Sequence, residues 1–141
     1  MLTDVPYEVC FSKAVQITDR DAHINECCVG GDVIMHRLLP AVRQRFSDIQ
    51  ANQEDWGWFI WFRAGRVSLA IDIFTDNPET GAFRLHLTAR RKRWALFDTV
   101  VDAPELEDVR QLVERELAGW TDAPCRVVRV DAKYRPVERD A

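Results

Sequence analysis

Residues 56–90 contain three successive runs that can be read as β-strands, the first almost wholly apolar and the other two with apolar residues at alternate positions, and this pattern constrains the fold more than any other feature of the chain. The runs cover residues 56–62, 67–74 and 83–90, and a period of two places successive side chains on opposite faces of a β-sheet. Turn sequences containing Gly65 and Gly81 separate the runs, since glycine adopts the left-handed conformations that tight turns need. The pattern predicts a three-stranded antiparallel meander with one apolar face and one mixed face.

The turns also predict a register for this meander. A turn over residues 63–66 pairs Phe62 with Val67 and, further along, Trp56 with Ile73, and a longer turn over residues 76–81 pairs Ile73 with Phe83. Both pairings put the same side chains on the apolar face, so they support each other. A one-residue bulge at Gly65 would exchange the two faces of the first strand, and the composition of the mixed face therefore depends on this turn.

Further strands and two helices are predicted around the meander. Apolar residues at alternate positions of residues 5–17 predict one long strand. The polar connection that follows has room for a short extended piece at residues 24–29. Two more strands are predicted at residues 94–101 and 125–132. Asp32 is expected to cap a helix whose apolar stripe runs from Met35 to Ile49 across Pro40, which should kink or divide it. Asp102 is expected to cap a second helix, which Pro104 opens and which ends near Gly119.

This order of elements predicts an α+β fold. We expect a two-layer sandwich with a mostly antiparallel sheet of about five or six strands and two helices packed on one face. The 141 residues suit a single domain, which we expect to cover residues 1–133, with residues 134–141 as a flexible tail. The first ten residues do not resemble a signal peptide and the longest apolar run is too short to span a bilayer, so we expect a cytoplasmic protein without a membrane partner.

Cysteine and histidine spacing argues against a metal centre. Cys27 and Cys28 are adjacent rather than arranged as C-x-x-C, and no histidine stands at ligand spacing from them. The four cysteines are therefore expected to be reduced thiols, mostly buried. We expect no metal ion and no cofactor.

The mixed face of the meander carries the side chains that could bind a ligand or take part in a reaction. In the predicted register Asp72 lies opposite Arg84 and diagonal to His86, a position from which a carboxylate could orient an imidazole, and Gly57 beside Asp72 leaves a shallow space. A basic run continues from this face along residues 90–93. The residues predicted to bind are Phe59, Trp61, Asp72, Arg84, His86, Arg90, Arg91 and Arg93.

The sequence contains no motif that names a reaction, and the catalytic residues are unknown. Five tryptophans and a central segment with seven basic and five acidic side chains, within a chain of net charge -4, favour a non-enzymatic domain that binds a protein partner or a second copy of itself through the aromatic and basic face. The alternative is a small-molecule-binding domain or small enzyme with a pocket near Asp72 and His86. Nucleic acid is not expected, because the whole chain is acidic and lacks a nucleic-acid motif.

Overall fold

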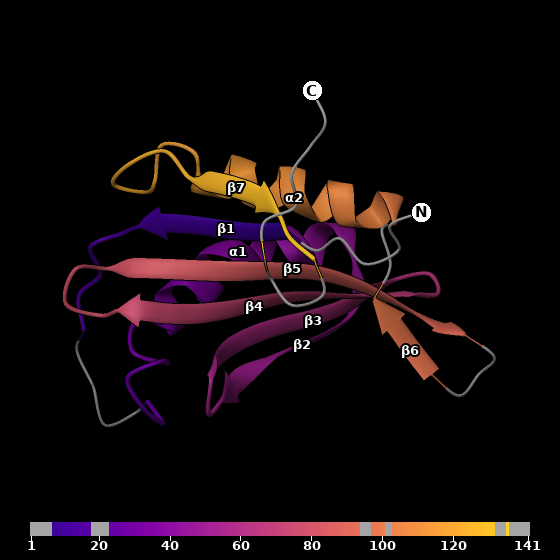
Figure 1. Ribbon diagram of the computed structural model, residues 1–141, viewed down its shortest axis with the longest axis horizontal. Coiled ribbons are helices and arrows are strands. Elements are labelled where there is room, and N and C mark those ends of the chain that lie inside the picture. The colour runs from indigo at the N-terminus through magenta and orange to yellow at the C-terminus, as the bar shows by residue number, and fades with distance from the viewer. Residues whose placement is uncertain (1–6, 18–22, 94–96, 101–102, 132–134, 136–141) are drawn as a thin grey trace.

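The computed structural model describes residues 7–17, 23–93, 97–100, 103–131 and 135, and it describes the backbone but not the side chains of residues 91–93 and 97–100. The elements, shown in Figure 1, follow in the order β1 (Tyr7–Ser12), α1 (Gly31–Arg45), β2 (Ser47–Glu54), β3 (Gly57–Ala64), β4 (Val67–Asn77), β5 (Ala82–Arg93), β6 (Phe97–Val100), α2 (Pro104–Leu117) and β7 (Arg126–Arg129).

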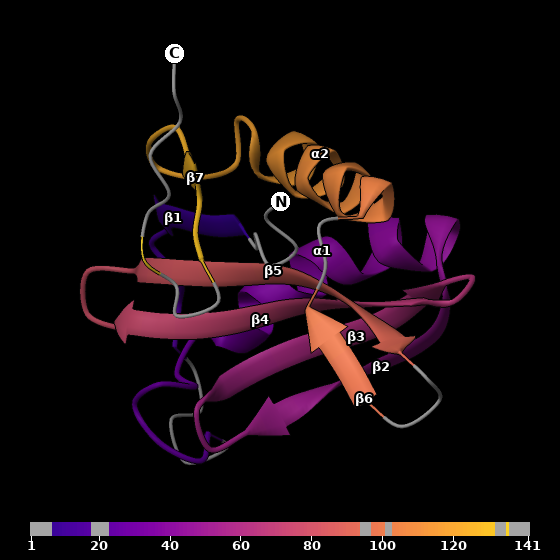
Figure 2. The same cartoon turned by 45° about the vertical axis from the view of Figure 1, so that its right-hand side comes forward.

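One antiparallel sheet organises the molecule. Six strands follow each other in the order β2-β3-β4-β5-β1-β7, and β6 pairs separately with the far end of β5. Both helices lie behind the sheet in Figure 1, and the turned view in Figure 2 shows β6 standing out from the opposite side. The predicted α+β fold, with a mostly antiparallel sheet and both helices on one face, is confirmed. None of the helices in the described part of the chain is long and apolar enough to cross a membrane.

The core fills the space between the sheet and the two helices. Strand β4 contributes Leu69, Ile71 and Ile73, of which the last two are completely buried, and α1 and α2 contribute apolar stripes that include Leu38 and Leu112. Burying one such side chain stabilises the fold by roughly 1.5–3 kcal/mol relative to leaving it exposed. The apolar face of the meander is therefore what holds both helices to one side of the sheet.

The predicted register of the meander is wrong by two residues, although its faces are right. The β3–β4 turn consists of only Gly65 and Arg66, so that Ala64 pairs with Val67 and Trp58 with Ile73. The second hairpin shifts in the same way, and Ile73 pairs with Leu85 instead of Phe83. A shift of two residues leaves every side chain on its own face, because the side-chain period of a strand is also two. Gly65 provides the left-handed conformation, with φ 60°, that the short turn needs.

The first helix is shorter than predicted, and a strand was missed after it. Phe46 has an extended backbone at the helix end and packs its ring 4.8 Å from that of Phe62, and Ile49 belongs to β2. Both residues reach the core from extended chain, a role that helical spacing alone does not distinguish from a helix position. Pro40 lies inside the single helix α1 and does not divide it.

Smaller differences occur at the ends of other elements. The first strand ends at Ser12 and the last covers only Arg126–Arg129, while residues 24–29 form bends and turns instead of an extended piece. Gly30, with φ 84°, occupies the cap position predicted for Asp32. Asp102 and, apart from Arg135, the predicted tail lie outside the described residues. All four cysteines are free thiols, but only Cys28 is buried and Cys27 is exposed.

Candidate functional site

The face of the sheet turned away from α1 and α2, here called the open face, presents side chains in rows across the strands. The pairing of β3, β4 and β5 places Arg63, Ser68 and Arg90 in one row. The next row contains Trp61, Ala70 and Thr88, and the row after it contains Phe59, Asp72 and His86. Side chains directly opposite each other on one face are near enough to interact, so these rows determine which groups meet.

A hollow of about 430 Å³ lies on the open face, and the row pattern explains its position. Ser68, Ala70 and Thr88 have short side chains and form its floor, while the longer side chains of Trp61 and Arg90 stand around them. We call this hollow the Trp61 groove. Its lining residues are Asp48, Gln50, Trp61, Phe62, Arg63, Ser68, Leu69, Ala70, Asp72, Thr88 and Arg90.

Aromatic rings stack along one side of the groove. The rings of Phe59 and Trp61 lie 4.0 Å apart, and Trp56 packs on both Phe59 and Phe74, with ring centroids 6.4 Å and 5.2 Å apart. Phe59 is consequently buried, at 6% exposure, whereas Trp61 remains 39% exposed. Trp56, which the predicted register placed opposite Ile73 on the apolar face, instead lies in the β2–β3 turn and packs against open-face rings.

The aromatic wall is tied to the one predicted carboxylate. The indole Nε1–H of Trp61 donates a hydrogen bond to Asp72 Oδ1 at 3.0 Å. Burial raises the pKa of Asp72, while the hydrogen bond from Trp61 and the positive charge of Arg90 oppose that rise. Asp72 therefore fixes the orientation of the Trp61 ring and closes one end of the groove with a partly desolvated acceptor.

His86 lies directly opposite Asp72, not diagonal to it as predicted, yet the two side chains turn to different partners. The Nε2 atom of His86 is 3.5 Å from Glu8 Oε2, and its ring packs 4.8 Å from that of Phe74. Burial, assisted by the charge of Arg84, lowers the pKa of His86 to about 4, so the imidazole is neutral at pH 7. The arrangement does not form the Asp–His dyad that the predicted register suggested.

The shallow space predicted beside Gly57 is also absent from the described residues. A Cβ atom added at Gly57 would lie 2.0 Å from the carbonyl oxygen of Ile73, so β3 and β4 approach closely there. The space on the open face lies instead above Ala70 of β4, which pairs with Trp61, four positions beyond Gly57 on β3.

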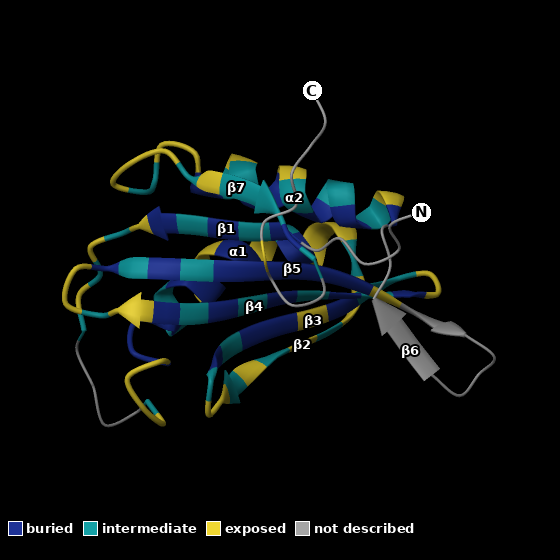
Figure 3. Ribbon diagram, in the orientation of Figure 1, coloured by how far each residue is buried: buried dark blue, intermediate teal, exposed yellow. Residues whose placement is uncertain are grey.

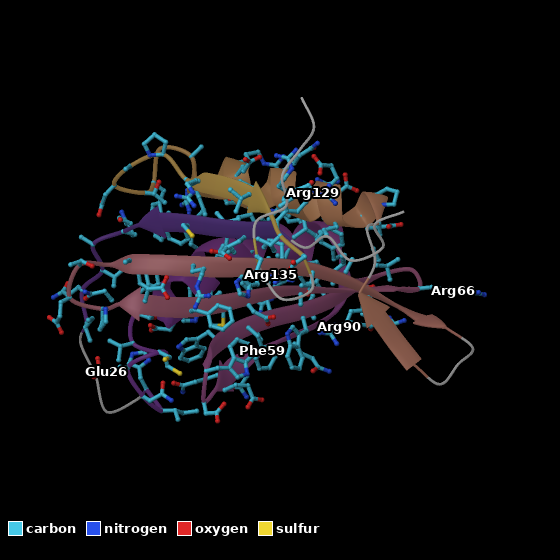
Figure 4. The ribbon with its side chains drawn as sticks, in the orientation of Figure 1. Glu26, Phe59, Arg66, Arg90, Arg129 and Arg135 are labelled. Carbon is cyan, nitrogen blue, oxygen red and sulfur yellow. The ribbon has the colours of Figure 1, made fainter. Side chains whose placement is uncertain are left out.

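The predicted arginines divide into three groups. Arg84 is paired with Phe74 in the register, forms an ion pair with Asp76 at 3.3 Å and lies over the Phe74 ring, away from the groove. Arg90 is exposed and lines the groove; Figure 4 labels it together with Phe59 on the side of the sheet that faces the viewer. Arg91 and Arg93 belong to β5, where they pair with Thr99 and Phe97 of β6, and their side chains lie outside the described part.

Eight of the eleven groove residues were not among the predicted binding residues, and three of these eight are in a different element from the predicted one. Arg63 was placed in a turn that is in fact shorter, and Asp48 and Gln50 belong to the strand that was read as part of a helix. An extra residue in β2 between Ser47 and Gln50 forms a β-bulge, in which Asp48 has the positive φ of 54°. Polar residues at positions 48, 50 and 52 alternate with Ile49 and Ala51, and this short period of two was the signal that could have revealed an edge strand.

Figure 3 shows that the central strands of the sheet are more buried than β2 at its edge. The central strands are mostly buried or half-buried, and β2 at the edge alternates between exposed and half-buried residues. A second hollow of about 470 Å³ lies at the end of α2 and is lined by residues 118–119 and 121–125 together with Glu114. It contains none of the predicted site residues. The described residues hold no cluster of three or more His, Cys, Asp or Glu that would suit a metal ion.

Comparison with known proteins identifies no relative. No family model, no curated protein and no solved structure matches the chain.

Proposed function

We propose that this protein is a non-enzymatic binding domain that takes a small molecule in the Trp61 groove. The observation that carries the proposal is the hollow itself, because its volume of about 430 Å³ lies in the range of roughly 300–1,000 Å³ that small-molecule sites occupy. Its lining combines four apolar residues, among them Trp61, with seven polar or charged residues that can orient a ligand.

The distribution of exposed apolar surface supports a local site rather than a broad interface. Among large hydrophobic residues in the described part of the chain, only Ile24 and Trp61 are exposed. Much of the aromatic surface of the open face is covered because the Trp56 ring packs on the rings of Phe59 and Phe74. Trp61 is thus left as the exposed aromatic anchor at the hollow.

The chemistry of the lining supports binding rather than catalysis. The hydroxyl groups at the groove floor, those of Ser68 and Thr88, have no histidine in the lining to act as a base. His86 is nearly completely buried and lies beside Glu8. The four free thiols, of which Cys27 is exposed, support a reducing location such as the cytoplasm.

The proposal is tested by identifying what the protein carries from cells. Native mass spectrometry of gently purified protein should show a bound small molecule that is released on unfolding. Trp61→Ala should abolish that species, and Ile24→Ala should retain it, because Ile24 is the other exposed large hydrophobic and does not line the groove. Equal retention of the small molecule in both variants would contradict the proposal.

A second candidate function is recognition of a protein partner or of a second copy of the chain by the same surface. It is favoured by the residue types around the groove, since tryptophan and arginine are the side chains that most often anchor protein interfaces, and Trp61, Arg63 and Arg90 are all accessible. Trp61→Ala combined with Arg90→Ala should then abolish association in sedimentation and in pull-down from lysate without unfolding the protein. Arg84 is a poor choice for this test, because it is already paired with Asp76.

A further inference from the structure

The two ends of the Trp61 groove differ in charge. At one end Arg63 and Arg90 stand in the same row on either side of Ser68, which pairs with both of them. Directly paired positions on one face have Cβ atoms about 4.5–5.5 Å apart, so two guanidinium groups can converge on a single group above the serine hydroxyl. At the other end lies the carboxylate of Asp72.

The arginine end is available for a ligand. Within the described residues neither Arg63 nor Arg90 forms an ion pair with a carboxylate, whereas Arg84 and Arg110 both do. The neutral hydroxyl of Ser68, 3.5 Å from an Nη1 atom, is the recorded partner of the Arg63 guanidinium. Arginine presents a planar set of donors that matches the oxygens of a carboxylate or phosphate, and this row offers two such sets and a hydroxyl.

The Asp72 end of the groove offers a hydrogen-bond acceptor instead of cationic donors. Asp72 is half-buried and uses Oδ1 to accept the Trp61 indole hydrogen bond, which leaves Oδ2 for a donor from a ligand. Ser68 and Asp72 are four positions apart along β4, a distance of about 13 Å between their backbones. The exposed Trp61 ring and the small Ala70 lie between them and leave a slot for a flat body.

We propose that the ligand of the groove is a flat molecule with an oxyanion, either carboxylate or phosphate, held by Arg63, Ser68 and Arg90, and with a hydrogen-bond donor at its other end that meets Asp72. This inference rests on the proposed function, since it specifies the ligand class for the same groove. A donor at the Asp72 end relieves the cost of burying that acceptor.

The test uses four chemically matched probes in place of an unidentified ligand. These are 4-hydroxybenzoate, which has the anion and the donor; benzoate, which lacks the donor; 4-hydroxybenzamide, which lacks the charge; and phenyl phosphate, which distinguishes phosphate from carboxylate. Two-dimensional NMR of the tryptophan indole N–H signals follows binding, because the Trp61 indole lies in the groove wall and bonds to Asp72. Trp61→Phe assigns the signal.

We expect 4-hydroxybenzoate to shift the Trp61 signal with saturation, and 4-hydroxybenzamide to bind at least about tenfold more weakly, as expected when a charge-assisted hydrogen bond is lost. Benzoate should bind more weakly by a smaller factor. Arg63→Gln and Arg90→Gln should each weaken the binding of 4-hydroxybenzoate by roughly tenfold. Arg84→Gln is the matched control and should change nothing, because Arg84 lies outside the groove.

The outcomes separate this inference from the proposed function. If the neutral amide binds as tightly as the acid, or the Arg63 and Arg90 variants bind as well as the Arg84 control, the oxyanion assignment is overturned while the groove remains a binding site. If none of the four probes shifts the Trp61 signal, the assignment is overturned as well. The proposed function then depends on the cell-derived small molecule and its loss in Trp61→Ala. If phenyl phosphate binds more tightly than benzoate, the assignment stands with phosphate as the oxyanion.

Discussion

Replacing Gly57 by alanine should destabilise this protein far more than the same change at Gly65. Both glycines stand at the ends of β3, and both have positive φ, 157° and 60°. Their surroundings differ. An added Cβ at Gly65 would meet no atom within 4 Å, whereas at Gly57 it would lie 2.0 Å from the Ile73 carbonyl oxygen.

The atoms that the new methyl group would meet at Gly57 cannot move aside easily. The Ile73 carbonyl belongs to the middle of β4, and the next residues of that strand are fastened to the segment before α1. There Thr75 N–H donates to Cys27 O at 3.1 Å and Thr75 Oγ1 donates to Val29 O at 2.8 Å. Overpacking costs typically about 1–3 kcal/mol, and a sparsely allowed backbone conformation costs about 1–3 kcal/mol more.

The expected loss for Gly57→Ala is therefore about 2–6 kcal/mol, against about 1 kcal/mol for Gly65→Ala, where only the left-handed backbone is penalised. At about 4 °C per kcal/mol for a domain of this size, the first change should lower the melting temperature by roughly 8–24 °C and the second by roughly 4 °C. Urea denaturation followed by circular dichroism and thermal scans measure both. Similar stability of the two variants would refute the argument that β3 and β4 are in close backbone contact at Gly57.

Three further predictions concern single side chains. The guanidinium of Arg110, together with the Tyr7 hydroxyl, lowers the pKa of Glu107 to about 2. The stability that the ionised carboxylate contributes is fully present above its usual pKa and is lost as the pH falls towards 2. Glu107→Gln should therefore reduce the dependence of the unfolding free energy on pH in this acid range. Burial lowers the pKa of His86 to about 4, so between pH 6.5 and 4 the unfolded state binds the proton more readily and the folded state loses stability as the pH falls. An NMR titration should place the His86 midpoint near 4. A midpoint above 6 would contradict the burial of this side chain. Asp48 has φ 54°, a backbone conformation that glycine adopts freely and a β-branched residue does not. Asp48→Val should therefore lower the unfolding free energy by about 1–2 kcal/mol in urea denaturation, and Asp48→Gly should change it by less than about 0.5 kcal/mol. Equal stabilities of the two variants would show that the backbone of the bulge adapts.

The alternation of residues 56–90 was sufficient to predict the antiparallel meander and, apart from Trp56, the membership of both of its faces. Face membership tolerates an error of two residues in register, and for that reason Phe59, Trp61, Asp72, His86 and Arg90 are on the predicted side despite the wrong pairing. Neighbour relations do not tolerate that error. The pairing of Asp72 with Arg84 was wrong because it depended on the β4–β5 turn, which was predicted over residues 76–81 but follows the pair Asn77–Ala82, and on the register shift between Thr75 and Asn77.

The edge strand β2 shows a different limit of the sequence. Apolar residues at positions 46 and 49 fit both a helix stripe and a strand that turns toward the core. The choice was made by tertiary packing, in which Phe46 places its ring against Phe62. Asp48 and Gln50 of the groove could not be placed without that strand.

The sequence by itself determined the two faces of the sheet, because successive side chains of a strand point to opposite faces whichever residues the strand pairs with. Only the tertiary structure decided that the open face contains a groove. The hollow exists because short side chains on β4 and β5 come into one register with Trp61, Arg63 and Arg90. Register is a non-local property that depends on turn length and core packing together, and so the placement of Arg63 and Arg90 on either side of Ser68 was not visible in the linear chain.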